Sequence, residues 1–128
     1  MSDQESMAPG SICWRDLTVR DAQAVSDFYQ GVVGWQASAV QMSGYNDFSM
    51  VTAAGETVAG ICHARGSNAD LPPQWLVYIV VADVEKSAAR CEELGGTVVA
   101  GPRAMGEGSL CVIRDPAGAV SALYQPSQ

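Results

Sequence analysis

The fold is decided by residues 16–35, DLTVRDAQAVSDFYQGVVGW, in which an extended segment passes directly into a helix. The strand pattern reaches back to Ser11, because side chains of opposite polarity alternate there as they do in a half-buried strand. Its two faces carry Cys13, Leu17 and Val19 on one side and Trp14, Asp16 and Thr18 on the other. Asp21 is a typical N-cap, and apolar residues then recur at helical spacing until Gly34. This stretch therefore predicts a strand followed by a helix.

The remainder of the chain continues this unit and then repeats it. Extended stretches near 35–42, 47–53 and 57–64 are separated by glycine-containing turns and predict an antiparallel meander. After a connector rich in glycine and proline, QWLVYIVVADV (74–84) predicts a strand, and Asp83 caps a second helix. Three more strands are predicted near 97–100, 109–114 and 119–124. The order β-α-β-β-β therefore occurs twice.

An internal repeat accounts for this order. Val19, Asp21 and Gly34 fall on Val81, Asp83 and Gly96 after a shift of 62 positions, so the cap, the helix length and the glycine stop coincide. The predicted organisation is a flexible lead-in at 1–10, a first module at 11–64, a linker at 65–74 and a second module at 75–126. Together the modules make one domain of the α+β class.

Composition restricts the classes of partner. A hydrophobic fraction of 48% with 16% charged residues indicates a globular protein, and a net charge of -7 disfavours nucleic acid and anionic membranes. No apolar run reaches the ~18 residues that a membrane span requires. The four cysteines are widely spaced and follow no signal region, which predicts reduced thiols and a cytoplasmic location.

The doubled unit resembles the vicinal oxygen chelate superfamily, which includes glyoxalases, ring-cleaving dioxygenases and bleomycin-resistance proteins. The resemblance is carried by DLTVRD…DFYQGVVGW in the first half and by VYIVVADV, ELGGTVV and DPAGAV in the second. It implies that the modules form an eight-stranded, cup-shaped mixed sheet with helices outside, and that metal-binding members hold an ion inside the cup.

The resemblance also locates the four positions that hold the metal in such members. They correspond here to Trp14, Leu76, Ala59 and Ala122, and none of these side chains is a metal ligand. If the alignment of the last strand in either half is shifted by one position, the residue becomes Val58, Gly60, Ser121 or Leu123, and none of these supplies a histidine, carboxylate or thiolate ligand. We therefore predict no metal and no cofactor.

The predicted lining of the cup is apolar and aromatic with few polar groups. Its candidate ligand-binding residues are Trp14, Asp16, Thr18, His63, Leu76, Tyr78 and Tyr124. Sites for small organic molecules have this composition, so the predicted partner is a small, partly aromatic organic molecule. The alternative is that these side chains fill the cup as core.

Two further functions stay open at this point. Asp16 or His63 could transfer a proton in a metal-independent isomerase or lyase, although a single histidine at a strand end is commonly a hydrogen-bonding or surface residue. A carboxylate on an apolar strand must be hydrated, paired or used, which makes Asp16 the more interesting acid. The other alternative is a structural or interaction role as a homodimer with a vestigial cup.

Overall fold

The computed structural model describes residues 7–127, which contain eight strands and two α-helices. The elements in chain order are β1 (Ile12–Val19), α2 (Ala22–Val33), β2 (Gln36–Gln41), β3 (Asn46–Val51), β4 (Thr57–His63), the short 3-10 helix η1 (Gly66–Asn68), β5 (Trp75–Val80), α3 (Val84–Glu93), β6 (Thr97–Met105), β7 (Gly108–Arg114) and β8 (Val120–Gln125). The strands belong to one mixed sheet in the order β2-β3-β4-β1-β5-β8-β7-β6. The α+β class and the doubled β-α-β-β-β order are confirmed.

The chain divides into two compact units. Residues 15–75 form what we call the central unit, and residues 7–14 together with residues 76–127 form the terminal unit. Strand β1 contributes residues to both. Residues 1–6 of the predicted lead-in lie outside the described residues, whereas Gly10 is tied to β5 by a hydrogen bond from its N–H to the carbonyl of Val80, 2.7 Å long.

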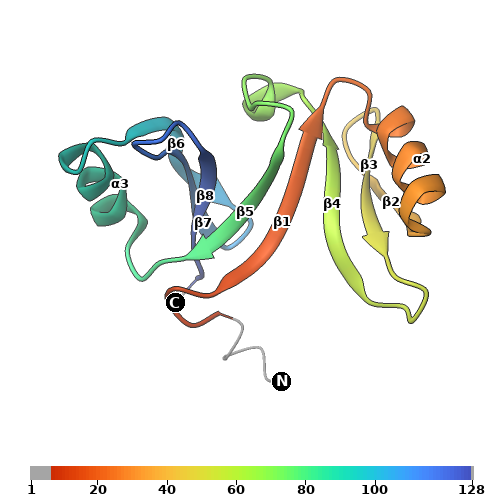
Figure 1. Cartoon of the computed structure of the whole chain (residues 1–128), viewed down its shortest axis with the longest axis horizontal. Helices are drawn as coiled ribbons and strands as arrows, with labels where there is room; N and C mark the ends of the chain where they lie inside the picture. Colours follow the sequence, from red (N-terminus) through yellow and green to blue (C-terminus); the bar gives the residue numbers. More distant parts are fainter. Residues whose placement is uncertain (1–6, 128) are drawn as a thin grey trace. The chain divides into compact units, whose positions relative to one another are not determined.

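In the central unit, α2 covers one face of its strands (Figure 1). Strands β2, β3 and β4 form the predicted antiparallel meander, and β4 then pairs in parallel with β1, with Asp16 opposite Gly60. The buried core between the helix and the strands comprises Leu17, Ala22, Phe48, Met50, Ala59 and Ile61. Since neighbouring strand residues point to opposite faces, Asp16 and Thr18 lie on the face opposite α2. We call the face without a helix the open face of a unit.

The terminal unit repeats this plan. Strands β6, β7 and β8 are antiparallel, and β5 pairs in parallel with β8, with Tyr78 opposite Ala122. These two residues lie 62 positions after Asp16 and Gly60, so the shift of the repeat is retained in the pairing register. The core beneath α3 comprises Val84, Ala88, Cys111 and Leu123. Tyr78 and Tyr124 therefore lie on the open face.

The motif FYQGVVGW has a packing role at the end of α2. Gly34 ends the helix with a φ of 87°, and its N–H donates to the carbonyl of Gln30. Trp35 then packs against Tyr29, with 5.9 Å between ring centroids. The indole N–H of Trp75 donates to the Tyr29 hydroxyl at 3.1 Å. These aromatic contacts hold the start of β2 and the last residue of the central unit against α2.

One strand is longer than its pattern predicts. Strand β6 continues past Ala100 to Met105, although Gly101 and Pro102 would normally end a strand. Register shifts on both sides of Ala100 accommodate these residues, and pairing with β7 resumes at Arg103 opposite Leu110. Gly101 is required there, because its φ is 82° and a Cβ would lie 2.6 Å from the Leu110 carbonyl. The irregular strand carries Met105 to the tip of the β6–β7 hairpin.

The structure also describes the cysteines and the length of the helices. All four cysteines are free thiols. Within residues 7–127, neither α-helix has the length and apolar character needed to cross a membrane.

A pair of leucine substitutions tests the terminal core. Leu123 is 7% exposed against α3, whereas Leu94 is 62% exposed after the helix ends. We expect Leu123→Ala to lower the free energy of unfolding by about 2–5 kcal/mol, because it leaves a cavity in the core. The control Leu94→Ala should change it by less than about 0.5 kcal/mol. Urea unfolding followed by circular dichroism would measure both, and equal effects would contradict the assigned core.

Candidate functional site: an aromatic pocket in the terminal unit

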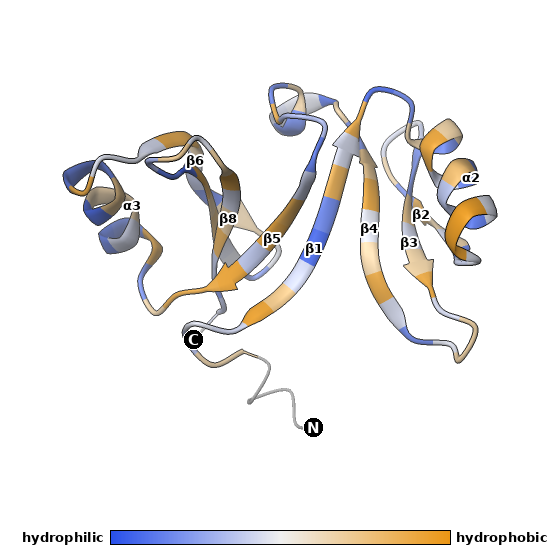
Figure 2. Cartoon of the chain, viewed as in Figure 1, coloured by the Kyte–Doolittle hydropathy of each residue, from blue (hydrophilic) through white to orange (hydrophobic). Residues whose placement is uncertain are grey.

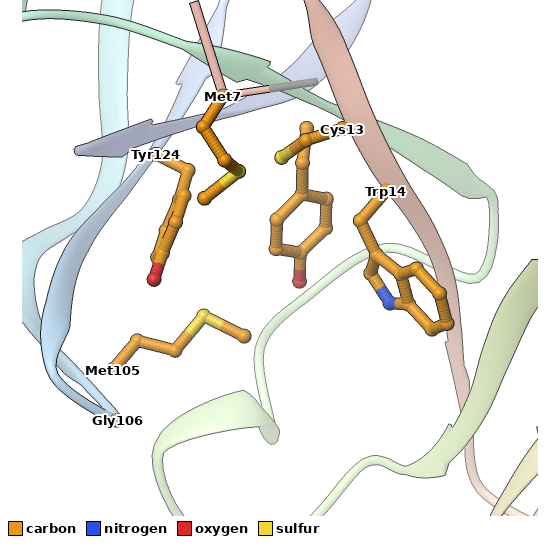
Figure 3. A pocket seen from close by; sticks show the side chains of 7 residues that line it. Met7, Cys13, Trp14, Met105, Gly106 and Tyr124 are labelled. Atoms are coloured by element: carbon orange, nitrogen blue, oxygen red, sulfur yellow. The ribbon is translucent and has the colours of Figure 1, made fainter. Parts of the chain in front are cut away.

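A cavity of about 430 Å³ opens on the terminal unit. It is lined by Met7, Cys13, Trp14, Tyr78, Met105, Gly106 and Tyr124. Figure 3 shows Trp14 and Tyr124 on opposite sides of the pocket, with Met7 and Met105 between them on the two remaining sides. Three residues of the predicted lining, Trp14, Tyr78 and Tyr124, are therefore brought together in one place.

Strand pairing positions the aromatic side chains. Val80 is opposite Tyr124 in the parallel β5–β8 pair, so Tyr124 shares the open face with Tyr78, two residues before Val80. The Val80 N–H donates to the Ser11 carbonyl, and the Gly10 N–H donates to the Val80 carbonyl, so the start of β1 is held beside β5. Trp14 follows three residues after Ser11. Backbone pairing between strands therefore positions the aromatic residues of the pocket, and the tip of the β6–β7 hairpin and Met7 lie at its edges.

Gly108 sets the position of the Tyr124 ring. A Cβ on Gly108 would lie 2.6 Å from the Tyr124 hydroxyl oxygen, and it would also clash with the carbonyl of Gln125. The Tyr124 ring therefore packs against the β7 backbone at Gly108, where no side chain is in the way. The hydroxyl lies on the Met105 side of the pocket (Figure 3).

The chemistry of the pocket is apolar and polarisable. Its lining holds three aromatic rings, two thioethers and a thiol, and none of its side chains carries a full charge. Aromatic faces and methionine sulfur pack well against flat ring systems, while phenol and indole groups provide hydrogen-bonding atoms. This combination suits a largely apolar molecule that carries hydroxyl or carbonyl substituents.

Sequence reasoning missed four residues of this pocket. Met7 falls in the predicted lead-in and Met105 beyond the predicted end of its strand, so neither had a predicted face. Cys13 was placed on the face opposite Trp14, yet it also lines the pocket near the beginning of β1, and Gly106 joins it from the hairpin turn. Leu76 is 1% exposed and is not among the lining residues. No sequence signal identified Met7 or Met105 as site residues.

The open face of the central unit has a different, more polar character. It carries Asp16 and Thr18 from β1 and Cys62 from β4, with Thr18 directly opposite Cys62 in the register. Thr18 also lines a second cavity of about 410 Å³, together with Val19, Arg20, Ala64, Ala69, Leu71 and Pro73. The predicted residues Asp16 and Thr18 thus belong to this unit, whereas the aromatic pocket belongs to the other.

Cys62 is an unreactive thiol in this polar environment. Burial raises its pKa, and the carboxylates of Asp16 and Asp47 raise it further, Asp47 also through a hydrogen bond with the thiol. Asp47 is itself buried, and its Oδ1 accepts a hydrogen bond of 2.9 Å from the backbone N–H of His63. Because the thiolate is the nucleophilic form, Cys62 has a structural rather than a chemical character.

The predicted orientation of His63 is wrong. His63 is opposite Val19 in the β1–β4 register and therefore lies on the helix-covered face, away from Asp16. Its Nδ1 is 3.2 Å from the Arg20 carbonyl and 3.5 Å from the Ala22 N–H nitrogen at the start of α2. Its ring also packs edge-on against Tyr45. The error arose because Ala59 was assigned to the inside of the cup. His63 lies four residues later on the same strand, so it was assigned to the same face.

The same register corrects one of the four metal-ligand positions. Ala59 is 0% exposed in the core beneath α2, so the open-face residue equivalent to Ala122 is Gly60. Glycine has no side chain to offer a metal. Among residues 7–127, no group of three or more histidine, cysteine, aspartate or glutamate side chains is arranged to hold an ion.

The sequence of the chain shows the family to which it belongs. A sequence model of the Glyoxalase/Bleomycin resistance protein/Dioxygenase superfamily matches residues 11–122. The chain therefore belongs to this superfamily, as its resemblance to vicinal oxygen chelate proteins implied.

The curated relatives are longer proteins. The anthracycline biosynthesis protein DnrV of Streptomyces peucetius is 32% identical over 131 aligned residues, which cover 92% of this chain and 48% of the relative. The putative glyoxylase CFP32 of Mycobacterium tuberculosis is 27% identical over 119 residues, covering 92% and 45%. The chain thus spans about half the length of the curated relatives that it matches.

Solved structures share the fold at low sequence identity. A variant of Streptomyces coelicolor methylmalonyl-CoA epimerase, in complex with 2-nitronate-propionyl-CoA, has a TM-score of 0.55 at 16% identity and covers 94% of this chain and 100% of its own. A superfamily member from Vibrio splendidus has a TM-score of 0.57 at 12% identity, covering 88% and 96%. Both support the same architecture.

The environment of Cys62 gives a testable consequence. We expect Asp16→Asn to speed alkylation of Cys62 at about pH 9 by a factor of roughly three to ten, because removing a nearby negative charge lowers the thiol pKa. The control Asp27→Asn lies on an exposed part of α2 and should leave the rate unchanged. Iodoacetamide labelling resolved by peptide mass spectrometry would measure this, and identical rates would place Asp16 too far from the thiol.

Proposed function

We propose that the terminal unit's pocket binds a small, largely apolar and partly aromatic organic molecule without the help of a metal ion. The observation that carries the proposal is the lining, in which Trp14, Tyr78 and Tyr124 surround a cavity of about 430 Å³ with no charged side chain. A cavity of this size lies within the range of ~300–1,000 Å³ that is common for small-molecule sites.

The arrangement of the side chains favours a flat ligand. Trp14 and Tyr124 stand on opposite sides of the space and Met105 lies at its edge (Figure 3). A ring system placed between them would contact aromatic surface on two sides and thioether carbon and sulfur on the others. The Tyr124 hydroxyl would then orient a ligand hydroxyl or carbonyl group.

The relative DnrV supports this ligand class. It is named for anthracycline biosynthesis, and anthracyclines are built on a fused, largely flat ring system with hydroxyl and carbonyl substituents. This chemistry matches the apolar lining and the phenolic hydroxyls of the pocket. The proposal extends to binding such compounds and not to the reaction of the longer relative.

Metal independence is supported by residue chemistry. Trp14, Gly60, Leu76 and Ala122 occupy the positions where metal-binding relatives would carry imidazole or carboxylate ligands. A catalytic ion needs about three such ligands to be held in place. Binding would therefore depend on ring packing and hydrogen bonding alone.

Binding of a hydroxylated anthraquinone, measured by calorimetry, tests the proposal. We expect Trp14→Ala and Tyr124→Ala each to weaken binding by about tenfold or more, because each removes an aromatic wall of the pocket. The control Tyr45→Ala removes an aromatic side chain that contacts His63 edge-on and Arg65 with its face in the central unit, so affinity should stay unchanged. EDTA should have no effect. Equal affinities for all variants, or loss of binding with EDTA, would reject the proposed site.

The enzymatic alternative is an isomerase or lyase, and the observed geometry favours Asp16 over His63 as its acid or base. Asp16 lies on an open face, whereas His63 lies on the helix-covered face against the start of α2. If the protein turns over a compound that it binds, we expect Asp16→Asn to abolish turnover and His63→Gln to retain it. Product formation, monitored by nuclear magnetic resonance, would measure the turnover of each variant. Unchanged turnover in Asp16→Asn would remove Asp16 from the mechanism.

A further inference from the structure

We propose that the second cavity, in the central unit, binds a small monocarboxylic acid with an apolar body, through the guanidinium of Arg20 and the hydroxyl of Thr18. This inference is independent of the aromatic pocket in the terminal unit. The cavity has a volume of about 410 Å³, and all of its lining residues belong to the central unit. Its size lies within the range of ~300–1,000 Å³ that is common for small-molecule sites.

The cavity lies where β1 and β4 end and the connector to β5 begins. The N–H of Ala64 donates to the carbonyl of Val19 at 2.7 Å, which holds the start of the connector beside the end of β1. Within the connector, the N–H groups of Asn68, Ala69 and Leu71 each donate to the carbonyl three residues earlier. The course of this wall is thus fixed by backbone hydrogen bonds, so a ligand would lose little affinity to ordering it.

Thr18 offers an unused hydroxyl to this cavity. The alternation of β1 directs its side chain to the open face, and only 4% of the residue is exposed. Among the residues that the structure describes, no group hydrogen-bonds to this hydroxyl. No fully buried side-chain oxygen of residues 7–127 lacks a partner, so the Thr18 oxygen is reached from the cavity. A ligand group that hydrogen-bonds to it would satisfy a polar atom that is otherwise largely shielded from water.

Arg20 supplies a positive charge at the same cavity. It follows Thr18 by two positions, so the two-residue period of β1 directs both toward the open face. Within the part of the chain that the structure describes, Arg20 has no ion-pair partner. The other two arginines of the central unit are engaged, because Arg65 stacks on a tyrosine ring and Arg15 donates to the Val58 carbonyl at 2.8 Å. Arg20 is therefore the cation available to a ligand.

The neighbouring carboxylates leave the Arg20 end of the cavity open to an anion. Asp16 lies two residues before Thr18, about 7 Å along the strand and on the side away from Arg20. Asp21 is committed to α2, where its carboxylate accepts a hydrogen bond of 3.0 Å from a backbone N–H. Neither of these residues nor Asp70 of the connector lines the cavity. With one cation and no carboxylate in the lining, the cavity suits a group with a single negative charge.

The other walls are apolar and favour an organic acid over an inorganic anion. They consist of Val19, Ala64, Ala69, Leu71 and Pro73. Figure 2 shows that the turn between β1 and α2, where Arg20 lies, is hydrophilic. The hydrocarbon body of a ligand would cover the aliphatic wall, while its carboxylate forms two parallel hydrogen bonds with the guanidinium. A bare inorganic anion would leave this apolar surface uncovered.

Titration of the isotope-labelled chain with phenylacetate, followed by nuclear magnetic resonance, tests the site. We expect shifts of the amides in 18–20 and 64–73, and a dissociation constant raised by about tenfold or more in Arg20→Gln, because charge-assisted hydrogen bonds are lost. The uncharged phenylacetamide should bind the wild type about tenfold more weakly for the same reason. The control Arg114→Gln removes the same charge from an exposed position of the terminal unit and should leave the constant unchanged.

Thr18→Val separates a role in binding from a role in folding. We expect it to raise the dissociation constant by about threefold to tenfold, while the urea midpoint stays equal or rises because the folded chain loses no hydrogen bond. Four results would each overturn the proposal: no shifts in 64–73, equal affinity for phenylacetamide, unchanged binding in Arg20→Gln, or a lower midpoint in Thr18→Val. Anthraquinone binding by Arg20→Gln should be unchanged, so failure of this site is distinguishable from failure of the aromatic pocket.

Discussion

The structure depends on the parallel pairing between the first and last strands of each half. The pairs Asp16 with Gly60 and Tyr78 with Ala122 set the same register in both halves. Because strand side chains alternate between faces, this register decides which residues enter the core beneath the helix and which are left on the open face. A slip of one residue would bury Asp16 and Tyr78 beneath the helices and expose Leu17 and Ile79. The aromatic pocket exists because the register excludes that arrangement.

The two halves keep the same backbone plan and differ in the chemistry of their open faces. Asp16, Thr18 and Cys62 in the central unit correspond to Tyr78, Val80 and Tyr124 after the shift of 62 positions. The central face is polar, with carboxylates that suppress ionisation of a thiol, and the terminal face is aromatic. A duplicated fold thus presents one surface suited to apolar ring systems and another suited to polar groups. This division explains why ring packing, rather than ion coordination, is the basis of the proposed binding.

Helices α2 and α3 also differ in a way that follows from their surroundings. Both begin at an aspartate N-cap, at Asp21 and Asp83, and each buries one face in its own unit. The outward face of α3 is charged, as expected for a helix in contact with water, whereas the outward face of α2 retains Phe28 and Val32. The two units therefore differ in helix surface, with an exposed apolar patch on α2 and a charged face on α3.

The sequence alone determined the features that depend on local periodicity. Alternation in the strands, the aspartate caps and the glycine stops predicted the eight strands and both α-helices in order, and the repeat predicted the doubled unit. The same alternation correctly placed Trp14, Tyr78 and Tyr124 on faces away from the helices, because a strand's two-residue period is a local property. Family membership followed from these motifs and was confirmed by the match over residues 11–122.

Tertiary structure decided the features that depend on register between distant strands. The faces to which the side chains of β4 point are set by its pairing with β1, about 40 residues away in sequence. The apolar run of β4 does not reveal them, because both of its faces carry small or apolar residues. For that reason Ala59 and His63 were assigned to the wrong face. Met7 and Met105 reach the pocket through a chain entry and an irregular strand whose courses are set by long-range backbone contacts, which no local pattern encodes.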